Sequence, residues 1–383
     1  MKNRPKRVLV VCHLALPHVG GVENLVDLEI RGLAAEGYEV TLLTSNGVGV
    51  GREPVYPPSV RIVRVRAWHM LEHRFDVPYP VFSPRLIIVL WRWLSWCDAV
   101  HAHGFLFQNS VLAIWLARLV GKPSILSDHG GLQQYSSTAV TTLAKLGAAT
   151  VGRLTVRFAT AVRTYNSRIQ QQLARFRHQN DVTFLANPVD QATFYPPTLE
   201  QKRKAREELK LPVERKIVLF VGRLIETKGV LLLLDSLDPQ FDAVFCGTGD
   251  PTILGSPPIP GVLYFPPRPQ TEVIKLYHAA DVLAMPCHVR EGFPVVVQEA
   301  VACGLPVVLG FDPGFDPYRK LPGLRFCELT PKSVRQELLA TLASARPSES
   351  PGLDKLFPPL NEWVRKLMAL VFLDQEQPNP RLT

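Results

Sequence analysis

A strand, a glycine-containing loop, a helix and a second strand follow one another at the start of the chain, and this order constrains the fold more than any other feature. Val8–Val11 is a short apolar run, rich in β-branched residues, that predicts a buried strand. A helix is expected to run to about Glu36 and to end at Gly37, before a second strand at Val40–Thr44. Two strands joined through a helix form a βαβ unit, so the chain is predicted to contain a parallel sheet.

A second segment of the same kind begins beyond the middle of the chain. Lys216–Val221 is predicted to be a strand, and the helix Val230–Leu237 follows it after a short loop. Thr271 is expected to be the N-cap of a later helix, Glu272–Ala280. Because 383 residues suit two domains of ordinary size, we predict two α/β domains with a boundary near residues 191–200.

The composition is that of a globular protein, with 46% hydrophobic and 20% charged residues. No apolar run approaches the roughly 18 residues that a transmembrane helix needs. The N-terminal sequence predicts a first strand rather than a signal peptide. The six cysteines show no zinc-type spacing, so we expect reduced thiols in a cytoplasmic protein.

The excess positive charge lies in the first half of the chain. Residues 1–190 contain 21 Lys and Arg against 12 Asp and Glu, which accounts for the whole net charge of +9. Such a field favours an anionic partner, here a membrane surface or a phospholipid-linked acceptor rather than nucleic acid. A solvated surface without a specific partner explains the charge excess as well. Leu86–Trp96 contains three tryptophans and predicts a helix that either packs in the core or touches lipid.

Two glutamates mark the candidate ligand site of the second half. Pro294 suits the first turn of a helix over residues 295–303, and Gly304 suits the position after its end. Glu291 then precedes the helix, and Glu299 lies inside it. At a rise of about 1.5 Å per residue the two carboxylates are about 12 Å apart, which is too far for a pair acting on one bond but matches the span of a nucleotide sugar.

The stretch EGFPVVVQEAVACGLPVVL, residues 291–309, resembles the Glu, seven residues, Glu motif of the retaining GT-B glycosyltransferases, and most of all the glycosyl group 1 transferases of family 4. The resemblance implies that Glu291 contacts the donor sugar and that Glu299 binds the ribose. It also implies that Arg268, after a later strand, lies beside the nucleobase. The residues implied to line the substrate site next to the first glutamate are Gly292, Phe293 and Pro294.

Two further motifs fit the same family. Arg223 and Lys228 are separated by four residues after a predicted strand, where two cations can bracket a diphosphate. The same Gly-Arg and Lys-Gly arrangement grips the donor pyrophosphate in the family, so both cations are implied to be catalytic. Near the N-terminus, Gly20, Gly21 and Glu23 match the family's Gly-Gly-x-Glu loop, which faces the donor phosphate.

Three histidines follow predicted strands. HAHG at residues 101–104 resembles the family's Asp-x-x-His-x-His strand end, and SDHG at residues 127–130 resembles the strand end that brings a histidine towards the donor sugar. Ligands of open α/β sheets bind at such ends, so His129 is predicted to be the active-site histidine. One alternative is a histidine satisfied by backbone groups. The other is a zinc site of His101, His103 and His129, which lacks an evident carboxylate or Cys ligand.

The resemblance implies the GT-B fold, an α/β architecture of two Rossmann-like domains that face each other across a cleft, with a C-terminal helix crossing back to the first domain. We predict an acceptor-side domain over residues 1–195 and a nucleotide-sugar-binding domain over 196–355. Residues 356–383 are predicted to be a closing helix, Asn361–Leu373, and a tail. The resemblance weakens after Leu309, where GFDPGFDPYRK replaces the family's usual Gly-Gly-x-x-Glu.

The family implies retaining hexosyl transfer from a UDP- or GDP-linked sugar to a glycan or lipid-linked acceptor, in the synthesis of cell-surface polysaccharide or glycolipid. No cofactor is implied, and no metal ion, since the sequence has no Asp-x-Asp motif. The protein is expected to be cytoplasmic and peripheral at the inner membrane face. Two alternatives are a non-catalytic GT-B scaffold that binds sugar or lipid, and a nucleotide-sugar-modifying Rossmann enzyme. The latter would need a dinucleotide fingerprint and a Tyr-x-x-x-Lys pair, which this sequence lacks.

Overall fold

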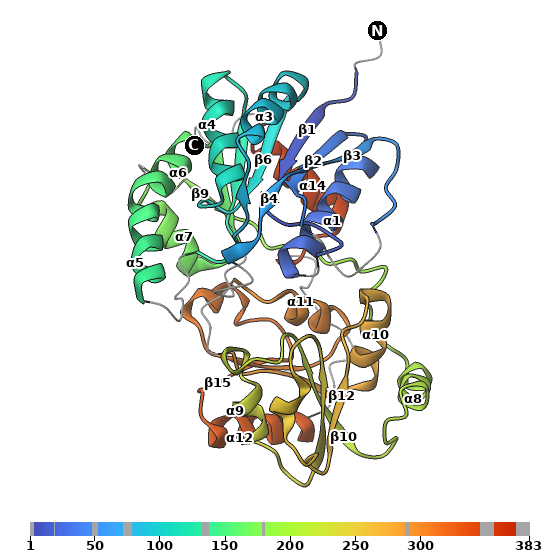
Figure 1. Ribbon diagram of the computed structural model, residues 1–383. Coiled ribbons are helices and arrows are strands. Elements are labelled where there is room, and N and C mark those ends of the chain that lie inside the picture. Colours follow the sequence, from blue (N-terminus) through green and yellow to red (C-terminus); the bar gives the residue numbers. More distant parts are fainter. Residues whose placement is uncertain are drawn as a thin grey trace. The chain divides into compact units, whose positions relative to one another are not determined.

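The computed structural model describes residues 4–18, 20–47, 53–71, 79–131, 138–177, 181–287, 292–344 and 356–372 (Figure 1). The chain divides into two compact units. Met1–Pro188 and Pro359–Thr383 form the first unit, and Val189–Pro358 forms the second. Each unit is built on a parallel sheet of its own.

The sheet of the first unit has the strand order β3-β2-β1-β6-β7-β8-β9 (Figure 1). Its strands are β1 (Arg7–Val11), β2 (Glu39–Ser45), β3 (Val60–Val65), β6 (Ala99–His103), β7 (Ser124–Ser127), β8 (Ala161–Thr164) and β9 (Val182–Phe184). A small antiparallel pair, β4 (Ala67–Trp68) and β5 (Val81–Phe82), lies outside it. The predicted βαβ unit is confirmed, because β1 and β2 pair in parallel and are connected by α1 (Gly21–Ala35).

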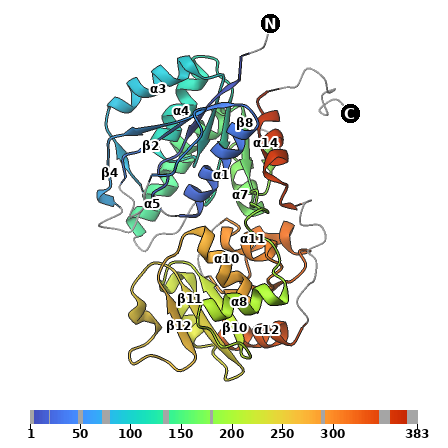
Figure 2. The same cartoon turned by 90° about the vertical axis from the view of Figure 1, so that its right-hand side faces the viewer.

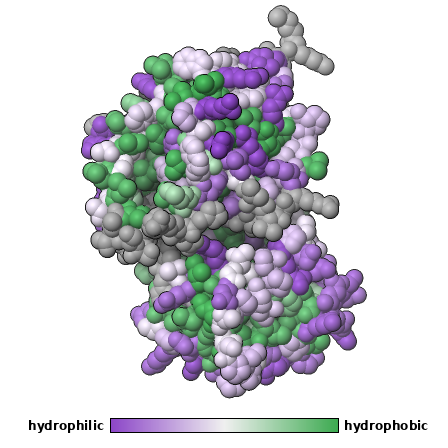
Figure 3. Space-filling model, viewed as in Figure 1, coloured by the Kyte–Doolittle hydropathy of each residue, from purple (hydrophilic) through white to green (hydrophobic). Residues whose placement is uncertain are grey.

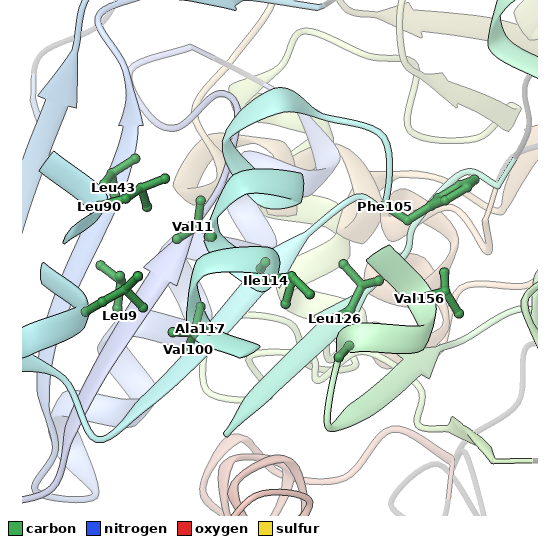
Figure 4. Close-up of a cluster of buried hydrophobic side chains, with 14 of the residues drawn as sticks. Leu9, Val11, Leu43, Leu90, Val100, Phe105, Ile114, Ala117, Leu126 and Val156 are labelled. Carbon is green, nitrogen blue, oxygen red and sulfur yellow. The ribbon is translucent and has the colours of Figure 1, made fainter. Parts of the chain in front are cut away.

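Helices cover both faces of this sheet, which explains why β6 and β7 are buried along their whole length and β2 at every residue but the first. Leu9 and Val11 belong to one core cluster, drawn in Figure 4, and Val8 and Val10 belong to the other, because successive side chains of a strand point to opposite faces. The other helical elements of the unit are α3 (Arg85–Trp96), α4 (Gln108–Leu119), α5 (Thr138–Gly147), η1 (Ala148–Gly152), α6 (Arg153–Phe158), α7 (Ser167–Ala174) and α14 (Leu360–Ala369).

The C-terminal helix α14 packs on α1 of the first unit (Figures 1 and 2). Trp363 is fully buried in the core cluster of that face, and its Nε1–H donates to the Ala186 carbonyl at 2.9 Å. At Gly32 of α1, an added Cβ would stand 2.8 Å from the Leu360 side chain, so the two helices approach closely there. The predicted closing helix is therefore confirmed.

The sheet of the second unit has the order β12-β11-β10-β13-β14-β15. Its strands are β10 (Lys216–Val221), β11 (Phe241–Cys246), β12 (Val262–Phe265), β13 (Val282–Met285), β14 (Val307–Gly310) and β15 (Leu324–Cys327). Its helical elements are α8 (Leu199–Glu208), η2 (Glu226–Lys228), α9 (Val230–Leu234), η3 (Pro251–Leu254), α10 (Gln270–Ala279), α11 (Val295–Ala302), η4 (Pro313–Tyr318) and α12 (Pro331–Ala343).

Two helix boundaries of the second unit differ from the prediction. Thr271 lies inside α10 rather than at its N-cap, because Pro269, which has an extended backbone, already accepts the first helical N–H bonds through its carbonyl. The predicted helix from Val230 stops at Leu234 instead of Leu237. There the Ser236 hydroxyl donates to the Leu232 carbonyl at 2.6 Å and competes with the helical pattern.

The strand order of each sheet reverses next to the first strand of its unit, between β1 and β6 in the first and between β10 and β13 in the second. The connections after two such neighbouring strands leave towards opposite faces of the sheet. This opens a crevice at the carboxyl ends of the strands, where open α/β sheets bind ligands. The loops after these four strands are therefore the first places to look for a site.

No helix within the described parts of the chain is long and apolar enough to cross a membrane. No disulfide joins any of the six cysteines, all of which lie within the described residues, and all but Cys287 are buried.

Candidate functional site

In the second unit, two glycine turns lie against each other after β10 and β11. Backbone hydrogen bonds of 2.9 and 2.6 Å join the turns. A Cβ added at Gly247 would stand 1.8 Å from the Gly222 carbonyl oxygen, so the turns can approach only where side chains are absent. Arg223 follows Gly222 directly, and its exposed side chain therefore starts from a firmly held backbone.

Lys228 is the last residue of η2, in the same loop between β10 and α9 as Arg223. Gly229 follows with a left-handed backbone, φ +83°, and an added Cβ would stand 2.1 Å from the Pro286 carbonyl oxygen. Pro286 comes directly after β13. The loop that carries both cations is thus packed on the chain at the β10–β13 switch point.

Helix α11 begins after its N-cap residue Pro294, which has an extended backbone. The helix ends at Ala302, and Gly304, two residues later, has a left-handed backbone with φ +61°. The predicted helix is confirmed with an end shifted by one residue. Inside it, Glu299 is 5% exposed, and the Tyr277 hydroxyl donates to its Oε2 at 2.7 Å. Burial raises the pKa of Tyr277 well above its ordinary value, and the Glu299 charge raises it further, so the phenol stays a donor and holds the carboxylate in place.

Glu291, the other acid of the predicted pair, lies outside the described residues. Its role and its distance from Glu299 therefore stay predictions. Gly292 and Pro294 lie between the described start of this segment and α11, and their predicted contacts with a substrate stay predictions too.

Phe293 is an anchor of the loop that leads into α11. It is 1% exposed and stacks on Tyr318 with ring centroids 3.7 Å apart, while Phe315 meets it edge-on at 5.3 Å. Phe357 completes the aromatic cluster at 6.1 Å. Because the Phe293 ring is buried in this cluster, only its backbone is left to contact a substrate. The two partners from η4 belong to the stretch in which the sequence departs from the family.

Arg268 lies after the edge strand β12, apart from the β10–β13 switch point. Its guanidinium stands over the Phe265 ring at 4.9 Å and pairs with Glu272 at 3.1 Å. It lines a hollow of about 510 Å³ together with Glu208, Leu209, Lys210, Phe265 and Lys275. Whether a nucleobase binds there stays a prediction.

In the first unit, the predicted Gly-Gly-x-Glu loop forms the start of α1. Gly20 is the N-cap, and Gly21 is the first helical residue. The Glu23 carboxylate folds back over Gly20, where an added Cβ would stand 2.3 Å from Glu23 Oε2. The other oxygen of Glu23, Oε1, lies 2.9 Å from His18 Nδ1. Burial would raise the pKa of Glu23, but the hydrogen bond from His18 lowers it below its ordinary value. The anionic Glu23 side chain therefore faces His18. The contact of this loop with a phosphate stays a prediction.

A carboxylate and three imidazoles form a chain of contacts at the carboxyl edge of the same sheet, in which all groups but the half-buried His129 are buried. Glu29 Oε1 of α1 lies 2.6 Å from His101 Nδ1, and its Oε2 lies 3.3 Å from His103 Nε2. His103 Nδ1 in turn lies 2.9 Å from His129 Nε2. The side chains of Glu29, His101 and His103 have no solvent exposure. The predicted active-site histidine is therefore joined to a buried carboxylate through a second histidine.

The charge states of this chain follow from its burial. Burial lowers the pKa of His101 to about 4, and burial together with the neighbouring His103 lowers the pKa of His129 well below its ordinary value. Burial would raise the pKa of Glu29, but the charges and hydrogen bonds of the two facing histidines hold it far below its usual range. Near neutral pH, Glu29 is thus a carboxylate, while His101 and His129 are neutral imidazoles.

The zinc alternative regains a carboxylate, because Glu29 supplies the ligand type that the sequence analysis found missing. Ligand atoms of Glu29, His101 and His103 all lie within 4.8 Å of one another. However, the 2.6 Å between Glu29 Oε1 and His101 Nδ1 is a hydrogen-bond distance. Two ligands about 2.0–2.1 Å from one tetrahedral ion would stand about 3.3 Å apart. The geometry therefore favours a hydrogen bond between Glu29 and His101 over a shared ion, whereas Glu29 Oε2 and His103 Nε2 make an ion-pair contact at 3.3 Å.

The fold and these sites together define a GT-B type of protein: two parallel α/β sheets, each with polar side chains at its switch point, and a C-terminal helix that packs on α1. Comparison with known families agrees. Residues 201–318 match the model described as "Glycosyl transferases group 1", and residues 19–193 match "Glycosyltransferase Family 4". The chain therefore belongs to the group 1, or family 4, glycosyltransferases.

Curated relatives cover part of the chain. The D-inositol 3-phosphate glycosyltransferase of Corynebacterium efficiens is 30% identical in an alignment of 162 positions that covers 36% of this chain and 38% of the relative. That of Mycolicibacterium gilvum is 33% identical in an alignment of 153 positions that covers 36% of this chain and 34% of the relative. The chain thus matches little more than a third of the length of these relatives.

Solved structures share the fold over nearly the whole chain. Sucrose-phosphate synthase from Thermosynechococcus elongatus has a TM-score of 0.72 and 20% identity, covering 95% of this chain and 98% of that one. HepE of Anabaena, in complex with UDP, has a TM-score of 0.71 and 16% identity, covering 94% and 98%. WaaG, a glycosyltransferase involved in lipopolysaccharide biosynthesis, has a TM-score of 0.66 and 15% identity, covering 95% and 99%.

Proposed function

We propose that the protein is a retaining glycosyltransferase that moves a hexosyl unit from a nucleoside diphosphate sugar to a glycan or lipid-linked acceptor. Membership of the family supports the reaction class. The observation that carries the proposal is the pair of cations, Arg223 and Lys228, in one loop packed on the β10–β13 switch point. A diphosphate is the ligand that two cations and nearby backbone N–H groups suit best.

Catalysis then depends on charge placed in advance. Arg223 and Lys228 bind the diphosphate and stabilise the negative charge that grows as its bond to the sugar breaks. The acceptor oxygen attacks the anomeric carbon from the side that the phosphate leaves, and the departing phosphate takes the acceptor proton. This step needs no cofactor, and the proposal includes no metal ion.

Three further residues position the donor in this proposal. Glu291 and His129 orient the sugar. Glu299 binds the ribose, with its carboxylate held by the Tyr277 hydroxyl at 2.7 Å. A UDP-linked donor is the first choice, since HepE has been solved with UDP and with UDP-glucose. Synthesis of a cell-surface polysaccharide or glycolipid is the matching pathway class.

A donor screen tests the proposed function. The full chain is incubated with UDP-, GDP-, ADP- and TDP-linked hexoses, and its melting temperature and the release of free nucleoside diphosphate are measured. Donors of one base should raise the melting temperature, since ligand at 100 times its Kd adds about 2.7 kcal/mol to the free energy of unfolding. Slow hydrolysis of the same donor should release its nucleoside diphosphate. The free nucleoside of the same base is the control and should have little effect. If no donor is bound or hydrolysed, the proposal is wrong.

We further infer that the first unit docks on an anionic membrane surface. Helix α5, η1 and helix α6 form one continuous helical segment, on which Leu143, Leu146 and Leu154 are 69%, 61% and 41% exposed. Lys145, Arg153 and Arg157 lie among them, and residues 131–180 contain no Asp or Glu. Exposed leucines beside cations suit the boundary between acyl chains and anionic headgroups.

Helix α3 offers a second apolar surface of the same unit. The predicted core packing is confirmed for its buried residues, which include Leu86, Leu90 and Trp93, whereas Ile88 and Trp91 are 72% and 51% exposed. Figure 3 shows apolar side chains gathered on this unit in the orientation of Figure 1. The lipid alternative raised for this helix therefore applies to one face of it only.

Vesicle sedimentation tests the membrane proposal. The protein should bind vesicles that contain phosphatidylglycerol, and the binding should weaken between about 0.1 M and 1 M salt, as the Debye length falls from about 10 Å to about 3 Å. The double variant Leu143→Ser and Leu146→Ser should lose at least about 100-fold in partitioning, since each leucine contributes about 1.5–3 kcal/mol when buried. Leu199→Ser, which changes an 88% exposed leucine of the second unit, is the matched control. Binding that is indifferent to salt and to the double variant would contradict the proposal.

A further inference from the structure

Glu29 has no part in the reaction proposed above, yet it is a charged side chain in the interior of the first unit. It has no solvent exposure, and its two oxygens face His101 and His103. An ionised carboxylate in such surroundings is unfavourable unless its neighbours donate to it. The feature that needs a reason is therefore a carboxylate placed behind two histidines, one of which touches His129.

The hydrogen atoms of this chain follow from the chemistry of its groups. A carboxylate only accepts, so the hydrogen-bonded His101 Nδ1 carries a hydrogen. We assign one to His103 Nε2 as well, because this atom lies 3.3 Å from Glu29 Oε2, which is an ion-pair distance rather than a formed hydrogen bond. With its single hydrogen on Nε2, His103 has a bare Nδ1, and the hydrogen in the 2.9 Å contact belongs to His129 Nε2. It follows that Nδ1 of a neutral His129 is bare and can only accept.

Two observations support this assignment. His101 Nε2, which the same logic leaves bare, lies 2.7 Å from the Ser127 hydroxyl, a group that can donate to it. His129 Nδ1 is buried and has no hydrogen-bonding partner among the residues that the structure describes. A buried acceptor without a partner is the kind of atom that a ligand satisfies.

We propose that Glu29 is a positioning residue: acting through His103, it holds His129 in the tautomer whose bare Nδ1 accepts a hydrogen bond from a hydroxyl group of the donor sugar. The identity of that ligand rests on the proposed function, whereas the hydrogen-bonded chain does not. A bare ring nitrogen attracts a hydroxyl and repels a carboxylate or phosphate oxygen, so the group selected at this atom is a neutral hydroxyl.

The charged surroundings of these rings come from three other elements. Arg163 of β8 reaches within 3.4 Å of the Ser127 hydroxyl and disfavours a protonated His129. His13, after β1, also interacts with His103, and burial lowers its pKa to about 4. Glu23 of α1 is nearer to His13 and His18 than to the chain. The carboxylate that directly faces the chain is Glu29, which makes it the residue to change.

The test combines nitrogen-15 NMR of histidine-labelled full-length protein with donor turnover. Ring nitrogen shifts report the tautomer, and the His129 signals are those lost in His129→Ala. In Glu29→Gln one of the two facing histidines meets an amide donor instead of an acceptor, and in Glu29→Leu neither meets an acceptor. We expect His129 to carry its hydrogen on Nε2 in the wild type, to shift towards the Nδ1–H form in at least one variant, and to lose about 10-fold in kcat/KM for donor hydrolysis there.

Thr41→Val is the matched control, because Thr41 of β2 is equally buried, lies outside this chain of contacts and has an unpartnered hydroxyl. It should leave the His129 signals and turnover unchanged, and circular dichroism should show that all variants are folded. His129 signals that keep the Nε2–H form in both Glu29 variants would overturn the proposal. So would a stoichiometric metal ion in the wild type that both variants lose.

The proposed function and the positioning of His129 by Glu29 can be tested separately. If the wild type turns over no nucleotide sugar but the His129 tautomer depends on Glu29, the proposed function is wrong and the positioning of His129 is supported. If donor turnover is found and the tautomer ignores Glu29, the proposed function is supported and this inference is wrong.

Discussion

Lys228→Ala is expected to lower the rate of nucleoside diphosphate release from the donor by about 100- to 1,000-fold, the usual effect of removing one preorganised group that stabilises a developing negative charge. Lys228 is the last residue of η2, and the Gly229 that follows it packs on the backbone after β13. The backbone of Lys228 is therefore held in a fixed position at the switch point. Water or a neighbouring lysine cannot restore a charge placed in this way. The measurement is the initial rate of UDP or GDP release at saturating donor.

The control for this variant is Lys204→Ala, which removes an exposed lysine from α8 and should leave the rate unchanged. Lys228→Arg is informative as well, because it keeps the charge but replaces a mobile point donor by a planar fork, and it should recover part of the rate. Glu291→Ala is expected to abolish hydrolysis in the same assay. If Lys228→Ala and Glu291→Ala both hydrolyse donor like the wild type, the assignment of the site to this region is wrong.

The features that could be predicted from the sequence are those with a local cause. Val8–Val11 and Lys216–Val221 are short apolar runs followed by glycine turns, and both became central strands of parallel sheets. Gly304 marks the end of α11 because glycine readily adopts the left-handed backbone that often follows a helix, and a glycine at this position is visible in the sequence. The cations of the β10 loop were found because their spacing and their glycines form a motif.

The features that were missed depend on contacts between distant segments. The aromatic cluster under Phe293 takes rings from η4 and from Phe357, and no local pattern connects these positions. Glu29 did leave a signal. It lies four residues after Leu25 and four before Leu33, both buried in α1, so an acid at that position was bound to be buried. Its partner could have been sought among the histidines that end a strand.

Gly229→Ala is expected to be strongly destabilising, and Gly37→Ala provides its matched comparison. The two glycines have almost the same left-handed backbone, φ +83° and +85°. An added Cβ at Gly37 meets nothing within 4 Å, whereas at Gly229 it would stand 2.1 Å from the Pro286 carbonyl oxygen. The difference between the two variants therefore isolates the close approach of the cation loop to the chain after β13.

For Gly37→Ala we expect a loss of about 1–2 kcal/mol in the free energy of unfolding, the cost of a left-handed alanine. Gly229→Ala should lose about 2–5 kcal/mol, because the strain of overpacking against a backbone carbonyl is added to that cost. Denaturant unfolding of the full chain, followed by fluorescence and circular dichroism, measures both. Gly229→Ala should also abolish the donor-induced rise in melting temperature, since relieving the clash moves Lys228, while Gly37→Ala should keep it. Equal losses of stability with donor binding intact in both variants would mean that the loop does not depend on its contact with Pro286. The cations would then need another explanation for their placement.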